Sequence, residues 1–276
     1  MTWRDAEPAA TTPPQPPSGN HWIRRYHTAA PNAPLLLCFP HAGGAASFFR
    51  PLSAALTPSI QVLSLQYPGR QDRRTEPPLD SIDALATQAR EALPPGITER
   101  PWVLLGHSMG ALVAFELARR ARSTPTGLIV SGRRAPPTHR EEYAHLLDDD
   151  GLAAEAARHE GPAAHLLADP EIRSAVLPCL RADYTAAETY HYRPGPALPC
   201  PMSALTGDRD PLCTVEEATC WKKCTDGSFR LRVFSGAHFF LDFQNADVVT
   251  AIREELGAMR AASTDTAPSQ SPAVDN

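Results

Sequence analysis

The sequence predicts an α/β fold in which a mostly parallel central sheet is flanked by helices and interrupted by a helical insertion. Short apolar runs of strand length recur at residues 35–39, 60–66, 102–105 and 126–132. Segments with helical spacing separate them, an alternation typical of parallel strands joined by crossover helices. The rhythm then stops, because residues 134–193 hold only Ala-rich, polar segments that favour helices. We expect this insertion to lie over the carboxyl ends of the strands, where such sheets bind ligands.

The chain has 276 residues, which is enough for one large domain. We expect that domain at residues 21–260, with the insertion at about 134–193 as a candidate lid. Residues 1–20 are rich in Pro, Ala and Thr and are expected to form a disordered N-terminal extension. Residues 261–276 are small and polar and are expected to form a disordered tail.

The individual elements follow from local patterns. The run Leu-Leu-Leu-Cys-Phe at 35–39 is apolar throughout, as expected of a strand buried on both faces. Ser81 is suited to cap the helix that it begins. The predicted order is an edge strand at 22–27, strand 35–39, helix 48–56, strand 60–66, helix 81–93, strand 102–105, a helix ending near 122, strand 126–132, the insertion, strand 200–205, helix 215–223, strand 229–234 and helix 245–259.

Composition excludes several classes of function. The formal net charge is −5 and there is no polybasic patch, which argues against general nucleic-acid or membrane-surface binding. The first residues lack the basic start and apolar stretch of a signal peptide, and the longest apolar runs are only strand-sized. Six dispersed cysteines lack the paired spacings of a zinc site. We therefore expect a reduced, cytoplasmic protein without a metal, and a monomer.

A candidate nucleophile lies in Gly-His-Ser-Met-Gly at residues 106–110, between an apolar run and a helical segment. A strand, a sharp turn carrying a serine, and a helix form the nucleophile elbow of serine hydrolases. Glycines flank the serine because side chains there would collide with the neighbouring strand and helix. The start of the helix directs free N–H groups towards negative charge that develops beside Ser108. The alternative is a tight loop without chemistry.

A serine nucleophile needs a base, and the base needs an orienting carboxylate. In this arrangement the partners follow in the order Ser, Asp or Glu, His, each after a later strand. Asp210 follows the strand at 200–205, and His238 follows the strand at 229–234. We predict that His238 takes the serine proton and that Asp210 orients the imidazole. Asp208, two residues earlier in the same turn, is the competing carboxylate.

Two backbone N–H groups are predicted to form the oxyanion hole, those of Met109 and Ala42. Ala42 lies in Pro-His-Ala-Gly-Gly after the first buried strand, where small residues let the backbone approach a substrate. A phosphate-binding loop is disfavoured, because no Lys-Ser/Thr follows the glycines. His107 and His41 flank the two loops, and we expect structural or pocket-lining roles for them.

Five segments, in order and at compatible spacing, carry a family pattern: Phe-Pro-His-Ala-Gly-Gly-Ala-Ala-Ser-Phe-Phe at 39–49, Tyr-Pro-Gly-Arg at 67–70, Gly-His-Ser-Met-Gly-Ala at 106–111, Gly-Asp-Arg-Asp at 207–210 and Gly-Ala-His-Phe-Phe at 236–240. Together they closely resemble the type II thioesterases, the stand-alone editing hydrolases of polyketide and nonribosomal peptide assembly lines. The resemblance covers about residues 22–256, and the candidate lid is its least diagnostic part.

The resemblance implies an α/β-hydrolase fold and the hydrolysis of acyl thioesters from the phosphopantetheine arm of an acyl or peptidyl carrier protein, with no cofactor of the enzyme's own. It also implies Ser108, Asp210 and His238 as the triad, with Met109 and Ala42 as oxyanion donors. A general carboxylesterase or acyltransferase is the alternative within this fold, because the same triad cleaves oxygen esters. A non-catalytic acyl-binding protein is the alternative outside catalysis.

The sequence leaves two alternative roles open for each of two groups of side chains. Arginines after the Tyr-Pro-Gly turn and after the serine helix either meet an acidic carrier protein or form a solvated basic face; they are Arg70, Arg73, Arg74, Arg119, Arg120 and Arg122. Leucines of the insertion either line an acyl chamber or form the core of the lid itself; they are Leu146, Leu147, Leu166, Leu167, Leu177 and Leu180.

Overall fold

A seven-stranded sheet forms the centre of the described molecule. The computed structural model describes residues 21–138, 140–159 and 167–265. The strand order is β1-β3-β2-β4-β5-β6-β7, and every neighbouring pair is parallel except β1 with β3. The strands are β1 (Ile23–Arg24), β2 (Leu35–Phe39), β3 (Gln61–Leu65), β4 (Trp102–His107), β5 (Gly127–Ser131), β6 (Met202–Gly207) and β7 (Phe229–Phe234). The mostly parallel sheet predicted from the sequence is confirmed.

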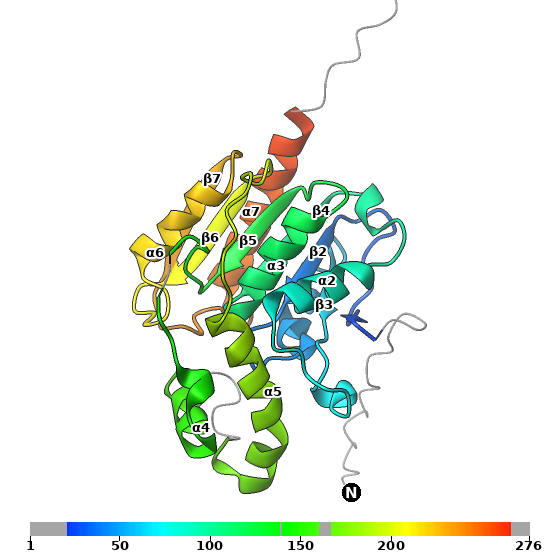
Figure 1. Cartoon of the computed structure of the whole chain (residues 1–276). Helices are drawn as coiled ribbons and strands as arrows, with labels where there is room; N and C mark the ends of the chain where they lie inside the picture. The colour runs from blue at the N-terminus through cyan, green and yellow to red at the C-terminus, as the bar shows by residue number, and fades with distance from the viewer. Residues whose placement is uncertain (1–20, 139, 160–166, 266–276) are drawn as a thin grey trace, which may run out of the picture.

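Helices cover both faces of this sheet (Figure 1). The α2 and α3 helices pack on one face, whereas α1 and α7 contribute to the core on the other. The helices of the main body are α1 (Arg50–Leu56), α2 (Ile82–Glu91), α3 (Met109–Arg120), α6 (Val215–Thr219) and α7 (Ala246–Asp265). Short 3-10 helices are η1 (Ala46–Phe49), η2 (Gln71–Arg73), η3 (Ile97–Glu99) and η6 (Cys220–Cys224).

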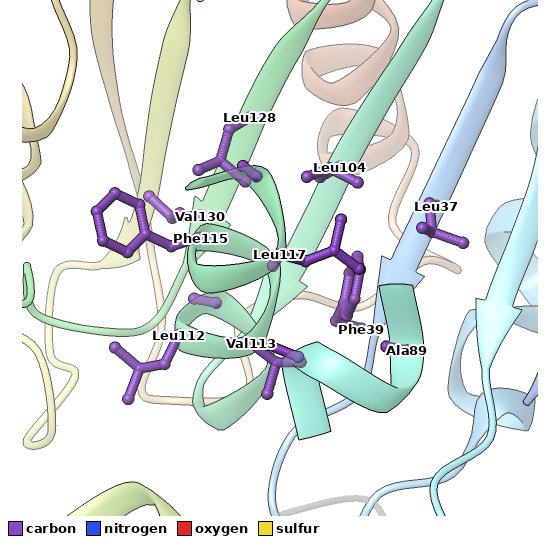
Figure 2. Packing of buried hydrophobic residues seen from close by; sticks show 14 of the residues in the cluster. Leu37, Phe39, Ala89, Leu104, Leu112, Val113, Phe115, Leu117, Leu128 and Val130 are labelled. Carbon is purple, nitrogen blue, oxygen red and sulfur yellow. The ribbon is translucent and has the colours of Figure 1, made fainter. Parts of the chain in front are cut away.

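The continuous apolar strands explain why the sheet is covered on both sides. Alternate residues of a strand point to opposite faces, so Leu37 and Phe39 join the core under α2 and α3, while Leu36 and Cys38 join the core under α1 and α7. Figure 2 shows the first of these cores, where Phe115 and other α3 side chains face the sheet. Packing on both faces therefore holds in place the strands whose carboxyl ends lead into the candidate active site.

The predicted helical insertion lies between β5 and β6. Its described helices are η4 (Ala144–Leu146), α4 (Asp149–Arg158) and α5 (Pro170–Glu188). In Figure 1, α4 and α5 lie beyond the carboxyl ends of the central strands rather than on either face of the sheet. A small apolar cluster of Leu152, Ala153, Leu177 and Leu180 holds these helices together. The insertion therefore has its own core. It lies at the carboxyl ends of the strands, where sheets of this type bind their ligands.

Several element boundaries differ from the sequence prediction. The expected edge strand at 22–27 is reduced to the two residues of β1, because only Ile23 and Arg24 pair with β3. The helix expected at 215–223 becomes a short α-helix followed by the 3-10 helix η6. The last helix runs to Asp265, past the predicted domain end at 260, because alanines that looked like a small-residue tail are strong helix formers. The predictions for residues 1–20 and 266–276 lie outside the described residues.

Six free cysteines are distributed through the described fold. Five are buried, namely Cys38, Cys179, Cys200, Cys213 and Cys224, and Cys220 is half-buried. Burial raises the pKa of each of the five buried thiols. They behave as small apolar side chains, as expected for Cys38. No helix within the described ranges combines the length and apolar character needed to cross a membrane.

Candidate active site

Ser108 lies in the turn between β4 and α3. Its backbone has φ 54° and ψ −120°, a strained conformation for a non-glycine residue. The Ser108 N–H donates to the Ser131 carbonyl at 2.8 Å, which ties the turn to the end of β5. A Cβ at Gly106 would lie 2.2 Å from the Gly110 carbonyl oxygen, and one at Gly110 would lie 2.1 Å from that of Phe39. The turn therefore has the strand–turn–helix form that the sequence predicted.

Replacing Gly110 by alanine is expected to destabilise the fold by roughly 2–4 kcal/mol, because the new methyl group would overlap the Phe39 backbone. Gly257→Ala is the matched control, since nothing lies within 4 Å of its Cβ position and the residue is in α7. We expect this control to stabilise by about 0.5–1 kcal/mol through helix propensity. Urea unfolding measures both changes; equal effects at the two glycines would contradict the steric argument.

The structure brings His238 between Ser108 and Asp210. The Nε2 atom of His238 lies 3.0 Å from Ser108 Oγ, and Nδ1 lies 2.9 Å from Asp210 Oδ2 and 3.1 Å from Oδ1. Both members of the His–Asp pair are buried, with 2% and 5% of their surface exposed. The carboxylate accepts the Nδ1–H, so Nε2 is left to accept the serine proton. The competing Asp208 instead accepts the Gly236 N–H at 2.9 Å and is partly exposed.

The two predicted oxyanion donors lie beside this serine. Met109 begins α3, and Ala42 lies in the loop after β2. Both residues line the same cavity as Ser108 and His238. The first N–H groups of a helix have no partner within the helix, and the positive end of its dipole favours an anion at this point. Residues from two separate segments, the start of α3 and the loop after β2, therefore line the cavity together with the serine.

The cavity has a volume of about 450 Å³ and is lined in large part by the helical insertion. Its apolar lining from the insertion consists of Ala144, Leu147, Ala156, Leu167, Ile172, Val176, Leu180 and Ala187. Its charged or ionisable lining includes Arg133, Glu142, Glu155, His159 and Glu188. Within the described ranges, no three His, Cys, Asp or Glu side chains are grouped so as to hold a metal ion. The arrangement suits an apolar chain with a few polar contacts.

The leucines of the insertion divide between the two interpretations. Leu147, Leu167 and Leu180 line the cavity, whereas Leu177 and Leu180 belong to the insertion's own core. Leu146 does neither, because 71% of its surface is exposed. Leu166 lies outside the described residues. Leu180 thus serves both roles and links the cavity wall to the packing of α5.

Two of the arginines expected on a basic surface do not lie on the surface. Arg70 and Arg73 are buried, and each is paired inside the fold rather than presented to solvent. Arg70 binds Asp183 of α5, and Arg73 binds Glu76 and the Gln66 carbonyl. Burial without such partners would be costly for a guanidinium group, so these internal acceptors explain why the side chains turn inward.

His107 and His41, which flank the two loops of the site, lie near the His238 imidazole. His107 stacks on His238 with ring centroids 5.1 Å apart, and its Nδ1 lies 3.1 Å from Ser131 Oγ. His41 lines the cavity and packs edge-on against Phe239. Burial, with a smaller contribution from neighbouring His238, lowers the pKa of His107 well below its usual range and that of His41 to about 3. Both rings are therefore neutral at pH 7, which agrees with the structural or pocket-lining roles expected for them.

Acid is expected to destabilise the fold through His41. Between about pH 6.5 and pH 3 the unfolded chain binds a proton at this imidazole that the folded protein does not, so stability is lost as the pH falls. From pH 7 to pH 5 the loss from this group is up to about 2 kcal/mol. Urea unfolding at both pH values should show that His41→Gln, which cannot titrate, loses correspondingly less. Equal losses in the two proteins would contradict a lowered pKa of His41 in the folded protein.

Comparison with known proteins places this geometry in a family. The Thioesterase domain model matches residues 34–256. A probable cadicidin biosynthesis thioesterase of Streptomyces griseus is 52% identical over 87% of this chain and 67% of its own length. The thioesterase PikA5 of Streptomyces venezuelae is 47% identical over 87% of each protein.

A solved structure agrees with these relatives. The type II thioesterase BorB from the borrelidin biosynthetic cluster is 48% identical and superposes with a TM-score of 0.79 over 85% of this chain and 97% of that one. Residues 34–256, which the family model matches, include the segments that carry Ser108, Asp210 and His238. The chain therefore belongs to the thioesterase family, as a type II thioesterase of the α/β-hydrolase fold.

Proposed function

We propose that this thioesterase hydrolyses acyl thioesters from the phosphopantetheine arm of an acyl or peptidyl carrier protein, through a covalent acyl-serine at Ser108. The observation that carries the proposal is the continuous hydrogen-bonded path from Ser108 Oγ through His238 to Asp210, which opens into a largely apolar cavity. The relatives named as biosynthetic thioesterases support an editing role in a polyketide or nonribosomal peptide assembly line.

The chemistry begins when Ser108 Oγ attacks the thioester carbonyl carbon and His238 Nε2 takes the hydroxyl proton. Asp210 holds Nδ1–H and stabilises the imidazolium. The carbonyl oxygen becomes an oxyanion that the N–H groups of Met109 and Ala42 stabilise. When the C–S bond breaks, the imidazolium returns its proton to the departing sulfur, which leaves as the thiol.

Water completes the reaction by the same steps. His238 takes a proton from a water molecule, whose oxygen attacks the acyl-serine carbonyl carbon. The resulting oxyanion collapses, the C–O bond to Ser108 breaks, and the proton returns to Oγ. The products are a carboxylic acid, the free carrier thiol and the original enzyme. No cofactor of the enzyme's own enters this sequence of steps. We propose further that the enzyme is a monomer and acts in the cytoplasm.

The helical insertion acts in this proposal as a lid over the acyl group. Leu147, Val176 and Leu180 of the insertion line the cavity with apolar side chains, and burial of a hydrocarbon chain there is favourable by about 0.8 kcal/mol per CH₂. Exclusion of water also strengthens the electrostatic interactions around the oxyanion. The lid therefore contributes both to substrate choice and to the rate.

A substrate panel tests the proposal. The same acyl group is presented on a carrier protein, on free pantetheine and as a simple oxygen ester, with chain length and branching varied. We expect kcat/KM to be highest for the carrier-bound thioester and lowest for the oxygen ester. A clear preference for the oxygen ester would favour a general carboxylesterase, and transfer to an added alcohol in place of hydrolysis would favour an acyltransferase.

A further inference from the structure

A buried ion pair joins the helical insertion to the main body of the enzyme. Asp183, on α5, has none of its surface exposed, and Arg70 has only 6%. The two Nη atoms of Arg70 bind the two carboxylate oxygens at 2.8 and 2.9 Å, a bidentate pairing. Asp183 is buried on the same helix as Leu177 and Leu180. A charged side chain therefore stands among the buried positions of α5.

Both members of this pair also hold the backbone of the loop after β2. The Gly43 N–H donates to Asp183 Oδ2 at 2.7 Å, and Arg70 Nη1 donates to the Gly44 carbonyl at 3.0 Å. Arg70 is itself fixed, because its Nε donates to the Pro68 carbonyl at 3.2 Å. The Ala42–Gly43 and Gly44–Ala45 peptide units therefore have one contact each to the ion pair.

The loop is built to accept this contact. Gly43 has φ +71°, a left-handed conformation that favours glycine, and a Cβ there would lie 2.9 Å from Leu180 Cδ1. The chain thus approaches α5 closely enough for its N–H to reach the carboxylate. Because the Gly43 N–H belongs to the peptide unit that begins at Ala42, its direction constrains the conformation of Ala42.

Stability alone does not account for a buried ion pair at this position. Removing two charges from water costs several kcal/mol per ion, and apolar side chains of similar size often replace such pairs without loss of stability. The Arg70 guanidinium also lies 5.1 Å from the centre of the Tyr67 ring, within a largely apolar environment. What an apolar pair cannot supply is an acceptor for Gly43 and a donor for Gly44.

We propose that Arg70 and Asp183 are positioning residues that hold the loop at Ala42–Gly44 so that the Ala42 N–H points at the oxyanion, and that the seating of α5 is thereby coupled to catalysis. The inference rests on the proposed function, in which Ala42 is an oxyanion donor. If α5 moves away from the loop, Gly43 loses its acceptor and the oxyanion hole loses its geometry. The enzyme then reaches full activity only with the C-terminal half of α5 in place.

Paired replacements separate positioning from stability. Arg70→Met with Asp183→Leu removes both charges together, so no unpaired ion is left in the interior, but Gly43 and Gly44 lose their contacts. We expect kcat to fall about 100-fold with KM changed less than about threefold, as for the loss of an oxyanion donor. Arg70→Met with Asp183→Asn keeps an amide oxygen for the Gly43 N–H and is expected to recover at least tenfold of that loss.

Ligand binding supplies a readout that a structural role would not move. An alkyl boronic acid, which forms a tetrahedral adduct with serine, should bind the Met/Leu variant about 100-fold more weakly. A non-hydrolysable acyl-pantetheine amide, which resembles the ground state, should bind it as it binds the parent enzyme. The control is Arg232→Met with Glu255→Gln, an ion pair between β7 and α7 in which Glu255 is buried and Arg232 is partly exposed, and for which kcat should stay at the parental value.

Arg70→Lys guards against failure of the double variants to fold. Lysine keeps the charge balance but cannot bridge Asp183 and the Gly44 carbonyl with a fixed planar group. We expect about a tenfold loss of kcat with KM unchanged. A folded Arg70→Lys or Met/Leu variant with parental kcat and parental boronate affinity would overturn the inference. The parent enzyme and Ser108→Ala are assayed in parallel. Absence of carrier-thioester hydrolysis by the parent enzyme would refute the proposed function. Boronate binding to the variants would still test the inference about the loop.

Discussion

Replacing Ser108 by alanine is expected to lower kcat for acyl-thioester hydrolysis by at least about 10³-fold while the fold remains intact. The hydroxyl is 3.0 Å from His238 Nε2, and without it no acyl-serine can form. The residual rate would come from water attack in a site that still holds its oxyanion donors. Thiol release measured with a chromogenic reagent gives kcat, and circular dichroism and urea unfolding check the fold.

The matched control for this substitution is Ser228→Ala. Ser228 is exposed and directly precedes β7, at the opposite end of that strand from His238. We expect the control to retain parental kcat. A serine-directed fluorophosphonate should label the parent enzyme and the control on the peptide that contains residue 108, but should not label Ser108→Ala. Undiminished hydrolysis by a folded Ser108→Ala protein would exclude this mechanism.

Replacing Asp210 by asparagine is expected to lower kcat by about 10³–10⁴-fold. The carboxylate accepts the Nδ1–H of His238 at 2.9 Å, which leaves Nε2 unprotonated and facing the serine. An asparagine amide can donate to Nδ1 and so favours the opposite tautomer, in which Nε2 carries the proton and cannot act as the base. KM should change little, because the substituted group lies behind the imidazole rather than against the substrate.

Asp208 provides the matched control for Asp210. It is two residues away in the same turn and accepts the Gly236 N–H rather than an imidazole proton. We expect Asp208→Asn to lower kcat by less than about tenfold, because an amide oxygen can still accept that N–H. Steady-state kinetics on the two variants decide between the carboxylates. A larger loss at Asp208 than at Asp210 would reverse their assignment.

The part of the fold that could be predicted from the sequence is the part set by local patterns. Residues 35–39 are apolar throughout, which requires cover on both faces, and the structure places helices there. The insertion was predicted because strand patterns are missing from residues 134–193, and α4 and α5 occupy its described part. Helix ends were less predictable, since Ala262 and its neighbours continue α7 beyond Met259.

The site shows the same division between local and long-range information. Ser108, Asp210 and His238 each follow a strand, so the sheet brings them together at one edge, and their order in the chain was sufficient to select them. Arg70 was misplaced on the surface because its partner Asp183 lies 113 residues later, in an insertion whose packing no local pattern specifies. The available signal was a lone aspartate at helical spacing from Leu177 and Leu180.

The buried cysteines have a consequence for an enzyme that handles acyl thioesters. A thiolate exchanges with a thioester readily, so an accessible cysteine near the substrate would take the acyl group and become S-acylated. Burial of five of the six thiols, with their pKa values raised, keeps those sulfurs protonated and away from the passing acyl chain. The fold can thus carry reduced cysteines without offering these five thiols as acceptors for the acyl group.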